Sequence, residues 1–281
     1  MKKNVKIGMI LLAIIVVVVC AKEEIIDYVF ASNKASAKGE ETQSVENILQ
    51  TNDKEEHENA IEEQKIENKI YKVQNKIFYT GNKEKKQIAI TFDDGPSKYY
   101  TDKVLEILKQ YEVKATFFVI GRHIERYPQE LIIISQEGHE IGNHSFNHKN
   151  FNKLTKAQIE EELMKTQQAL NNTIGNHTNI FRPPYGALGK DSLESVNELG
   201  YNAVNWSVDT RDWSGVSVEQ IMDKVKHQLY SGGIILMHSS GSDKAMENML
   251  TALPQIIEWA KTEGYEFTTV SQLLELQEGE I

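Results

Sequence analysis

Residues 88–96 read Ile-Ala-Ile-Thr-Phe-Asp-Asp-Gly-Pro. The first five are apolar or β-branched and predict a strand. The strand ends in two adjacent carboxylates, Asp93 and Asp94, followed by Gly95 and Pro96, which are common in turns. Neighbouring carboxylates are costly at the end of an apolar strand unless they share a cation or a proton. The stretch therefore predicts a strand that delivers acidic groups to a site, and a plain turn is the alternative.

Six further strand-like runs follow along the chain. They are residues 115–120, the stretch that leads to Ile141, and residues 180–181, 203–208, 234–237 and 267–270. Between them, residues 104–111 place apolar side chains at helical spacing, and Thr155 and Ser217 each precede a Gln by three positions, as in a capping box. Strands that alternate with helices indicate a parallel sheet covered by helices. About seven strands in some 200 residues favour a (β/α) barrel over an open sheet.

In a (β/α) barrel the chemistry is expected at the C-terminal ends of the strands, and the unusual residues of this chain gather there. His144 and His148 follow the third run, and one helical turn would place both imidazoles on the same face. Two imidazoles and a carboxylate leave a fourth ligand position open, as a catalytic zinc ion requires. A polar surface loop is the alternative interpretation.

The fourth run leads into Arg182, two prolines and Tyr185. Prolines fix the backbone and have no N–H group, so they can aim the amide of Tyr185 into a site. The charged Arg182 can orient a carboxylate through a forked hydrogen bond. A rigid loop with a satisfied arginine is the alternative.

The fifth and sixth runs also end in polar residues. Asp209, Asp212 and Trp213 follow the fifth, and a Trp beside acidic residues suits a wall that faces a sugar, although a core Trp is commoner. Leu236 and His238 close the sixth run. A structural histidine is the alternative there, but His238 falls at the same end of the sheet as the other polar residues.

Taken in this order, the residues resemble the five motifs of the polysaccharide deacetylase family, carbohydrate esterase family 4. The resemblance covers residues 72–276, and no motif position departs from the family pattern. It implies a distorted (β/α) barrel. The matching residues are Thr91-Phe92-Asp93-Asp94-Gly95, His144-Ser145-x-x-His148, Arg182-Pro183-Pro184-Tyr185, Asp209-x-x-Asp212-Trp213 and Leu236-x-His238.

The resemblance also implies a metal centre and a general base. A divalent metal, zinc with cobalt or a similar ion as the alternative, would be held by Asp94, His144 and His148. Asp93, oriented by Arg182, would be the base. The family reaction removes acetyl groups, mostly N-acetyl groups, from sugar polymers.

The chemistry of that reaction suggests roles for the remaining motif residues. We expect the backbone N–H of Tyr185 to hold the oxyanion and His238 to protonate the departing amine. A neighbouring carboxylate would keep the imidazole cationic, and we assign this pairing to Asp212, with Asp209 as the alternative. The pocket for the acetyl methyl group and the sugar face would be lined by Leu236 and Trp213.

The N-terminal part of the chain predicts export. Residues 7–21 carry no charge and follow three lysines, a pattern that suits a signal peptide, and a second apolar run at residues 25–30 makes a retained anchor the alternative. The single cysteine, Cys20, excludes a disulfide framework. We expect residues 1–30 to form a membrane anchor or signal peptide, residues 31–71 an acidic disordered spacer, and residues 72–281 the catalytic domain.

The charge of the chain is concentrated in its globular part. The 281 residues carry a formal net charge of −10; residues 1–85 hold 13 basic and 14 acidic residues, which leaves 18 and 27 from residue 86 onward. An acidic domain argues against non-specific binding to nucleic acid or anionic lipid. We therefore expect the chain to contact a membrane only through its N-terminal segment, if that segment is uncleaved. We also expect a monomer.

These observations together predict an exported, metal-dependent deacetylase that acts on N-acetyl groups of peptidoglycan, on N-acetylglucosamine or N-acetylmuramic acid, and releases acetate. A secreted deacetylase of chitin or chitooligosaccharides, or an acetyl-xylan esterase, is the enzymatic alternative. A wall-binding module without turnover, and an amidase acting on the peptide stem, are the alternatives of other classes.

Overall fold

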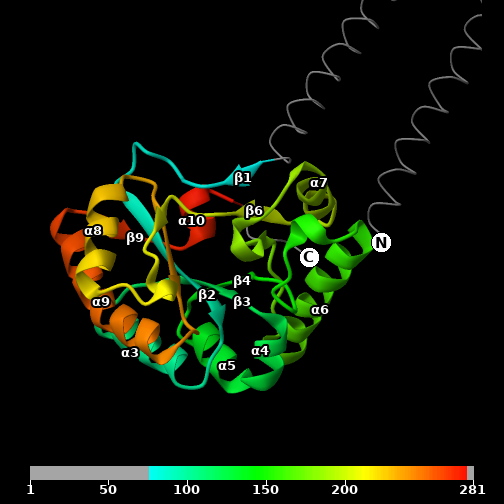
Figure 1. The fold of residues 1–281 in the computed structure, drawn as a ribbon, viewed down its shortest axis with the longest axis horizontal. Coiled ribbons are helices and arrows are strands. Elements are labelled where there is room, and N and C mark those ends of the chain that lie inside the picture. The colour runs from blue at the N-terminus through cyan, green and yellow to red at the C-terminus, as the bar shows by residue number, and fades with distance from the viewer. Residues whose placement is uncertain (1–75, 277–281) are drawn as a thin grey trace, which may run out of the picture. The chain divides into compact units, whose positions relative to one another are not determined.

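The computed structural model describes residues 76–276, which belong to a compact unit formed by Lys69–Ile281 (Figure 1). The expected leader and spacer, residues 1–71, lie outside the described residues, and those expectations stay predictions. Among the described residues, no helix combines the length and the apolar character needed to cross a membrane.

The described part of the chain forms one nine-stranded sheet in which every pairing between strands is parallel. The strand order is β1-β6-β5-β4-β3-β2-β8-β7, and β9 pairs with the beginning of β2. The strands are β1 (Ile77–Phe78), β2 (Gln87–Gly95), β3 (Thr116–Val119), β4 (Glu140–Asn143), β5 (Ile180–Phe181), β6 (Asn202–Val204), β7 (Val208–Asp209), β8 (Ile234–His238) and β9 (Glu266–Phe267).

The short connection between β6 and β7 shows that this sheet is strongly curved. β6 and β7 lie six places apart in the strand order, so a flat sheet would hold them roughly 29 Å apart. The chain from Val204 to Val208 spans at most about 14 Å. The two ends of the sheet must therefore approach each other, and the expected distorted (β/α) barrel is confirmed. Among the described strands no pairing joins β7 to β1, so the barrel keeps an open seam.

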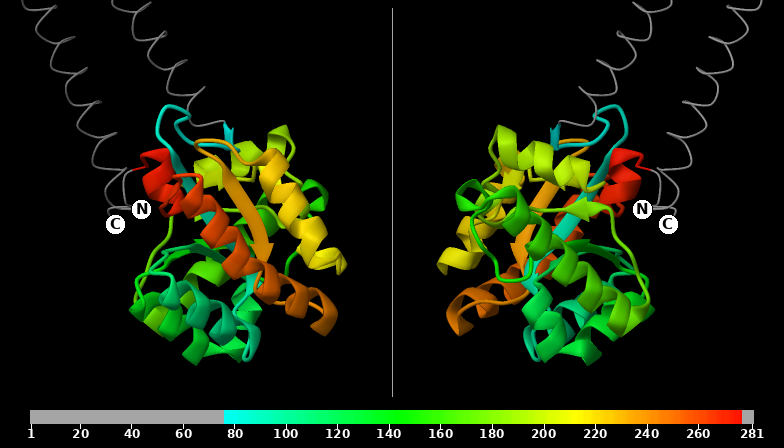
Figure 2. Two further views of the ribbon diagram at one scale, coloured as in Figure 1. Left: turned by 90° about the vertical axis from the view of Figure 1, so that its left-hand side faces the viewer. Right: turned by 90° about the vertical axis from the view of Figure 1, so that its right-hand side faces the viewer.

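Helices surround the strands on the outside of the barrel (Figures 1 and 2). The capping boxes expected at Thr155 and Ser217 are present, and they begin α6 and α8. The helices are α3 (Tyr100–Gln110), α4 (Gly121–Arg126), α5 (Pro128–Gln136), α6 (Lys156–Ile174), α7 (Lys190–Glu198), α8 (Val218–Gln228), α9 (Asp243–Thr262) and α10 (Val270–Leu274), with single 3-10 turns η1 (Phe151–Lys153), η2 (Pro184–Gly186) and η3 (Asp212–Ser214).

Three details of the strand assignment differ from the sequence-based expectation. The run 203–208 divides into β6 and β7, because the chain crosses there from one end of the strand order to the other. The run 267–270 ends as a strand at Phe267, because Thr269 and Gln272 form a capping box that begins α10. Strand β1 has only two residues, which are too few to show the alternation from which a strand is predicted.

The alternation of side chains along β2 separates the hydrophobic core from the site. Ile88, Ile90 and Phe92 are fully buried and pack in the large cluster formed with the surrounding helices. Because successive side chains of a strand point to opposite faces, Thr91 and Asp93 face the inside of the barrel. Both are buried as well, with Asp93 only 3% exposed. The same strand therefore fills the core and carries a carboxylate to the barrel end.

Candidate active site

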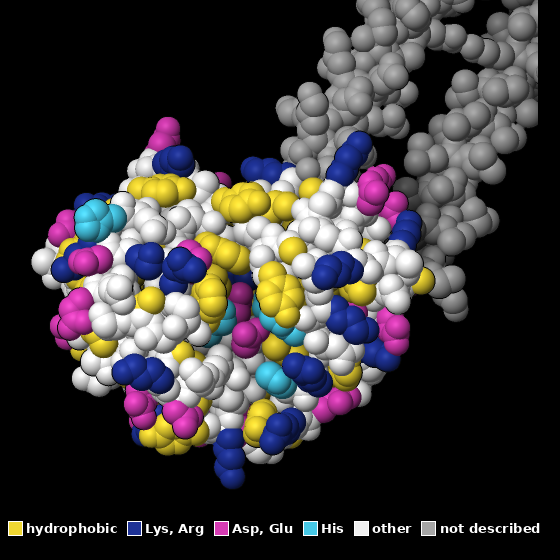
Figure 3. Space-filling view, viewed as in Figure 1, with side chains coloured by type: hydrophobic (Ala, Val, Ile, Leu, Met, Phe, Trp, Pro, Cys, Tyr) yellow, Lys and Arg dark blue, Asp and Glu magenta, His cyan; other side chains and the backbone are white. Residues whose placement is uncertain are grey.

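The expected site residues converge at the C-terminal ends of β2, β4, β5, β7 and β8. Because the strands are parallel, these ends lie on one side of the barrel. Asp93 and His238 are register partners on the adjacent strands β2 and β8. His144, Arg182 and Asp212 follow β4, β5 and β7 within a few residues. The space-filling view shows a hollow on this face, with acidic and histidine side chains in its floor and hydrophobic ones around it (Figure 3).

Asp94, His144 and His148 form a cluster suited to a metal ion. Their three ligand atoms lie within 4.8 Å of one another. Oδ1 of Asp94 is 3.2 Å from Nε2 of His148 and 3.5 Å from Nε2 of His144. Ligand atoms around a tetrahedral zinc ion lie roughly 3.3–3.6 Å apart. Oδ1 of Asp94 is also shielded from solvent and accepts no hydrogen bond within the described residues. A buried carboxylate oxygen without a donor, facing two imidazole nitrogens, fits a divalent cation.

The protonation states of the three residues suit this role. Nδ1 of His144 donates a hydrogen bond to the backbone oxygen of Arg182 at 2.7 Å, which leaves Nε2 with the free lone pair. Burial and the neighbouring His144 lower the pKa of His148, so this imidazole is neutral, as a ligand must be. Burial raises the pKa of Asp94, but the rings of His144, His238 and His148 outweigh it and lower the pKa overall. Asp94 therefore stays ionised.

The two histidines meet on a loop, and the expected helical turn between them is wrong. Oδ1 of Asn143 accepts a hydrogen bond from the N–H of Ser145 at 2.8 Å, and Oγ of Ser145 accepts one from the N–H of His148 at 3.0 Å. Ser145, His148 and Asp94 all have left-handed backbone conformations, with φ of 66°, 58° and 67°. Such conformations are costly for residues with a side chain and concentrate at functional sites. Side-chain turns, not a helix, bring His144 and His148 together.

Arg182 holds Asp93 in place from inside the barrel. The arginine is fully buried, and its Nη1 donates to Oδ1 of Asp93 and to Oγ1 of Thr91, each at 2.7 Å. The expected forked contact is absent, because Nε and Nη2 donate to the backbone oxygens of Val204 and Asn205. Oδ2 of Asp93 remains directed toward the cluster of Asp94, His144 and His148, 3.8 Å from Nε2 of His144. The carboxylate is thus fixed at one oxygen and free at the other.

His238 is paired with Asp212. Oδ1 of Asp212 lies 2.9 Å from Nδ1 of His238, and Oδ2 accepts the backbone N–H of His238 at 2.8 Å. Burial lowers the pKa of His238, but the charge and hydrogen bond of Asp212, together with the charges of Asp93 and Asp94, outweigh it and raise the pKa to about 9. The alternative partner, Asp209, instead accepts the backbone N–H of Arg211. The imidazole is therefore cationic at neutral pH, and its Nε2 takes no part in the contact with Asp212.

The remaining expected residues lie around the cluster. Tyr185 is 68% exposed and has a left-handed backbone with φ of 63°. Its ring lies edge-on to the ring of His148, with the two ring centroids 4.7 Å apart. Trp213 follows Asp212 in η3 and is 52% exposed. Leu236 is buried and lies two residues before His238, on the same face of β8.

Two contacts at the site were not expected from the sequence. Thr91 donates to the backbone oxygen of Ile235 and accepts from Arg182, so it links β2, β8 and the arginine. His123 of α4 donates from Nδ1 to the backbone oxygen of Asp94 at 2.8 Å and supports its left-handed turn. Thr91 stands in a motif but looks like any β-branched strand residue. His123 has no spacing relation to the other histidines that could have identified it.

Comparisons with known proteins agree with this geometry. A sequence model described as polysaccharide deacetylase matches residues 80–204. The chain is 38% identical over 197 residues to a peptidoglycan-N-acetylglucosamine deacetylase of Bacillus cereus, covering 70% of this chain and 71% of the relative. It is 36% identical over 201 residues to the peptidoglycan-N-acetylmuramic acid deacetylase PdaA of Bacillus subtilis, covering 70% and 74%.

A solved structure supports the same assignment. The crystal structure of the peptidoglycan N-acetylglucosamine deacetylase Bc1960 superimposes with a TM-score of 0.70 at 36% identity, covering 73% of this chain and 95% of that one. The identity and coverage exceed what a shared fold alone would give. The chain therefore belongs to the polysaccharide deacetylase family, carbohydrate esterase family 4, and is an amide-hydrolysing enzyme of that family.

Proposed function

We propose that this enzyme removes N-acetyl groups from amino sugars of bacterial peptidoglycan, N-acetylglucosamine or N-acetylmuramic acid, and releases acetate. The observation that carries the proposal is the placement of Asp93 and His238 as register partners beside the cluster of Asp94, His144 and His148. An acetamide in the hollow would have a proton acceptor and a proton donor on adjacent strands. The relatives named for peptidoglycan deacetylation support the choice of polymer.

Asp94, His144 and His148 would hold a divalent metal ion. One carboxylate oxygen and two imidazole nitrogens suit zinc, with cobalt as the alternative. When bound, the ion would polarise the amide carbonyl and lower the pKa of water.

Asp93 would act as the general base. Its Oδ1 is held by Arg182, and its Oδ2 faces the cluster, so Oδ2 is the atom that accepts the proton of the attacking water. Because Arg182 is fully buried and carries a permanent charge, the salt bridge holds the carboxylate in one orientation. The role of Arg182 is to position the base.

The carbonyl oxygen becomes negative when water attacks, and a backbone donor would stabilise it. Tyr185 carries the first N–H after Pro183 and Pro184, and its left-handed conformation turns the chain beside His148. We assign the Tyr185 N–H to the developing oxyanion. Leu236 would contact the acetyl methyl group, and the half-exposed ring of Trp213 would contact the sugar face.

His238 would donate the proton that lets the amine leave. An amide anion cannot depart unaided, so the C–N bond breaks only when the nitrogen is protonated. Asp212 supports this role, because it keeps the imidazole cationic and fixes Nδ1–H toward itself, so that Nε2 is the donating atom. The products are acetate and a free sugar amine.

We further propose that residues 1–30 export the chain and that residues 31–71 act as a spacer between the membrane and the enzyme. The support is the charge step before residues 7–21 and the polar composition that follows. Fractionation of cells tests this: the chain should be found in the membrane fraction or, if the segment is cleaved, in the medium or wall. Recovery of the intact chain from the cytosol would contradict it.

The function is tested by measuring acetate released from purified peptidoglycan, chitooligosaccharides and acetylated xylan, with and without a chelator. We expect release from peptidoglycan that stops when the chelator is added and returns with zinc. Faster release from chitooligosaccharides or xylan would favour the secreted enzymes given as alternatives. Cleavage of the peptide stem without acetate release would indicate an amidase, and the absence of turnover with all three polymers would favour a binding module.

A further inference from the structure

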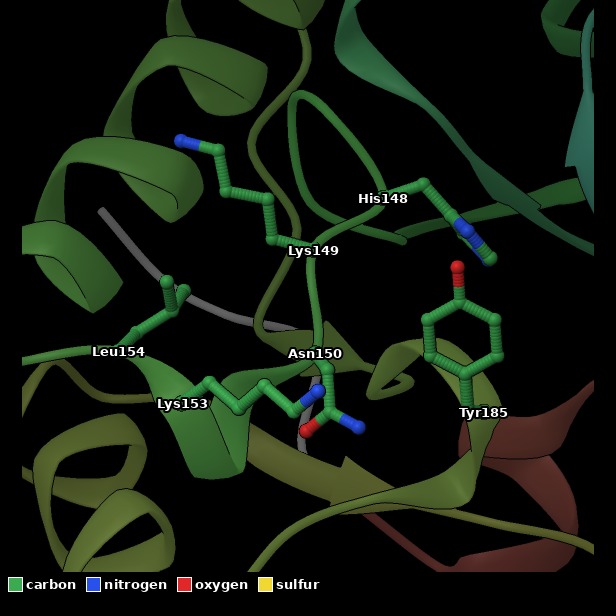
Figure 4. Close-up of a pocket in the computed structure, with 6 residues that line it drawn as sticks. All are labelled: His148, Lys149, Asn150, Lys153, Leu154 and Tyr185. Atoms are coloured by element: carbon green, nitrogen blue, oxygen red, sulfur yellow. The ribbon is translucent and has the colours of Figure 1, made fainter.

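A cavity of about 520 Å³ adjoins the active site on the side of η1 (Figure 4). Two of its lining residues, His148 and Tyr185, also belong to the site described above, so the cavity continues that site. A polymer whose acetamide lies at the metal cluster would place a neighbouring sugar here. The cavity is lined by His148, Lys149, Asn150, Lys153, Leu154 and Tyr185.

The lining of this cavity is basic although the globular part of the chain is acidic. Residues from 86 onward carry 18 basic and 27 acidic side chains, yet the cavity is lined by two lysines and by no Asp or Glu. Lys149 is neutralised, because its Nζ pairs at 2.9 Å with Glu162, whose side chain is only 3% exposed. Figure 4 shows Lys149 running away from Tyr185. Lys149 is thus part of the scaffold.

Lys153 differs from Lys149. It is exposed at the end of η1 and forms no ion pair within residues 76–276. In Figure 4 its side chain extends toward Asn150, in the cavity. Oδ1 of Asn150 accepts the backbone N–H of Asn152 at 3.0 Å, so the amide group of Asn150 is oriented and its Nδ2 remains a donor. Lys153 and Asn150 therefore offer one positive charge and N–H donors beside the site, an arrangement that suits a carboxylate.

We propose that Lys153 and Asn150 form a subsite for the carboxylate of a sugar next to the one that is deacetylated. The inference rests on the proposed function and refines its substrate class. N-acetylmuramic acid carries a lactyl ether with a carboxyl group, which is free in strands without stem peptides, whereas chitooligosaccharides carry no carboxylate. The half-buried Leu154 offers an apolar contact to the lactyl methyl group. The enzyme should therefore prefer strands in which a carboxylated sugar lies beside the acetylated one.

The test compares Lys153→Met and Lys153→Glu with the wild type, using the full-length protein with its metal. Lys226→Met on α8 removes one exposed lysine far from the cavity and is the matched control. Acetate release gives kcat and KM, and calorimetry gives Kd, for peptide-free peptidoglycan strands and for neutral chitotetraose. We expect Lys153→Met to raise KM and Kd for the carboxylated strands about two- to fivefold, as for an exposed ion pair, with kcat unchanged. Lys153→Glu should raise them further.

Three comparisons decide the outcome: neutral against carboxylated glycans, low against high salt, and strands without against strands with stem peptides. Chitotetraose should respond to none of the variants, and the effect on carboxylated strands should disappear near 1 M salt, where the Debye length is about 3 Å. Equal effects on both glycans, or none on either, would overturn the subsite. An effect seen only with strands that keep their stem peptides would show that Lys153 binds a carboxylate of the peptide and not of the sugar. That result would contradict the proposal. Binding that depends on Lys153 without any acetate release would support the subsite and refute the proposed function.

Discussion

Substitution of Asp212 by Asn isolates the charge that keeps His238 protonated. The change preserves the size of the side chain, and Oδ1 of Asn can still accept the backbone N–H of His238. What is lost is the negative charge 2.9 Å from Nδ1 of His238. Burial of the imidazole, which lowers the pKa of His238, remains, and so do the charges of Asp93 and Asp94, which raise it.

The magnitude follows from the pKa of His238, which rises from 6.5 to about 9; Asp212 is the largest cause of the rise, and the charges of Asp93 and Asp94 add to it. A pKa difference of this size corresponds to about 3 kcal/mol between the two protonation states. At pH 7 roughly 99% of His238 is cationic at a pKa of about 9, whereas only about a quarter would be cationic if the pKa returned to 6.5. The Asn variant should therefore lose activity at pH 7, and the alkaline limb of its profile of kcat against pH should move to lower pH by up to about two pH units.

The same pair affects stability, because the folded-state pKa lies above the unfolded one. Its stabilising contribution is complete below pH 6.5 and is lost as the pH rises through about 9. Below pH 6.5 the wild type should exceed Asp212→Asn in unfolding free energy, and the gap should close toward pH 9. The assays are acetate release from pH 5 to 10 and urea unfolding over the same range. An alkaline limb that stays in place in the variant would refute the assignment of His238 as the acid held cationic by Asp212.

Three further variants test the metal cluster, the buried salt bridge and the packing of the sheet. His144→Ala should lower zinc affinity by at least tenfold in a calorimetric titration and abolish turnover, because it removes one of three ligands; unchanged affinity would show that the ion binds elsewhere. Arg182→Met should lower the free energy of unfolding in urea by about 3–5 kcal/mol, because Asp93 would stay buried without its partner; a loss below about 1 kcal/mol would mean that Asp93 is not held as described. Gly142→Ala should cost about 1–3 kcal/mol in the same assay, because its Cβ would lie 2.5 Å from the Phe118 ring; a neutral result would show that the ring moves aside easily.

The candidate site residues could be selected from the sequence because their chemistry is unusual for the ends of apolar strands. His144 and His148 could be selected as candidate metal ligands from residue type, and the resemblance to the polysaccharide deacetylase family added Asp94. The alternation of strands and helices placed all three at one end of a parallel sheet. Spacing alone suggested a helix for the two histidines. The structure uses hydrogen bonds from Asn143 and Ser145 to turn a loop instead, and such local side-chain turns leave no periodic signal.

Contacts between residues that lie far apart in the chain could not be predicted from the sequence. Arg182 meets Asp93 through one nitrogen because the carbonyls of Val204 and Asn205 occupy the others. That arrangement depends on where the chain leaves β6, which no motif encodes. His123 reaches the backbone of Asp94 from α4, and only the packing of α4 against the barrel end brings the two residues together.

The central claim is that Asp93 is the base of a metal-dependent deacetylation. It is tested most directly by Asp93→Asn in the full-length protein, with bound zinc and acetate release from peptidoglycan measured on the same samples. Asn retains the shape and the contact with Arg182 but cannot take a proton. We predict that zinc content stays near that of the wild type while kcat falls by about 10²–10⁴-fold. Substantial turnover by Asp93→Asn with its metal bound would contradict the account.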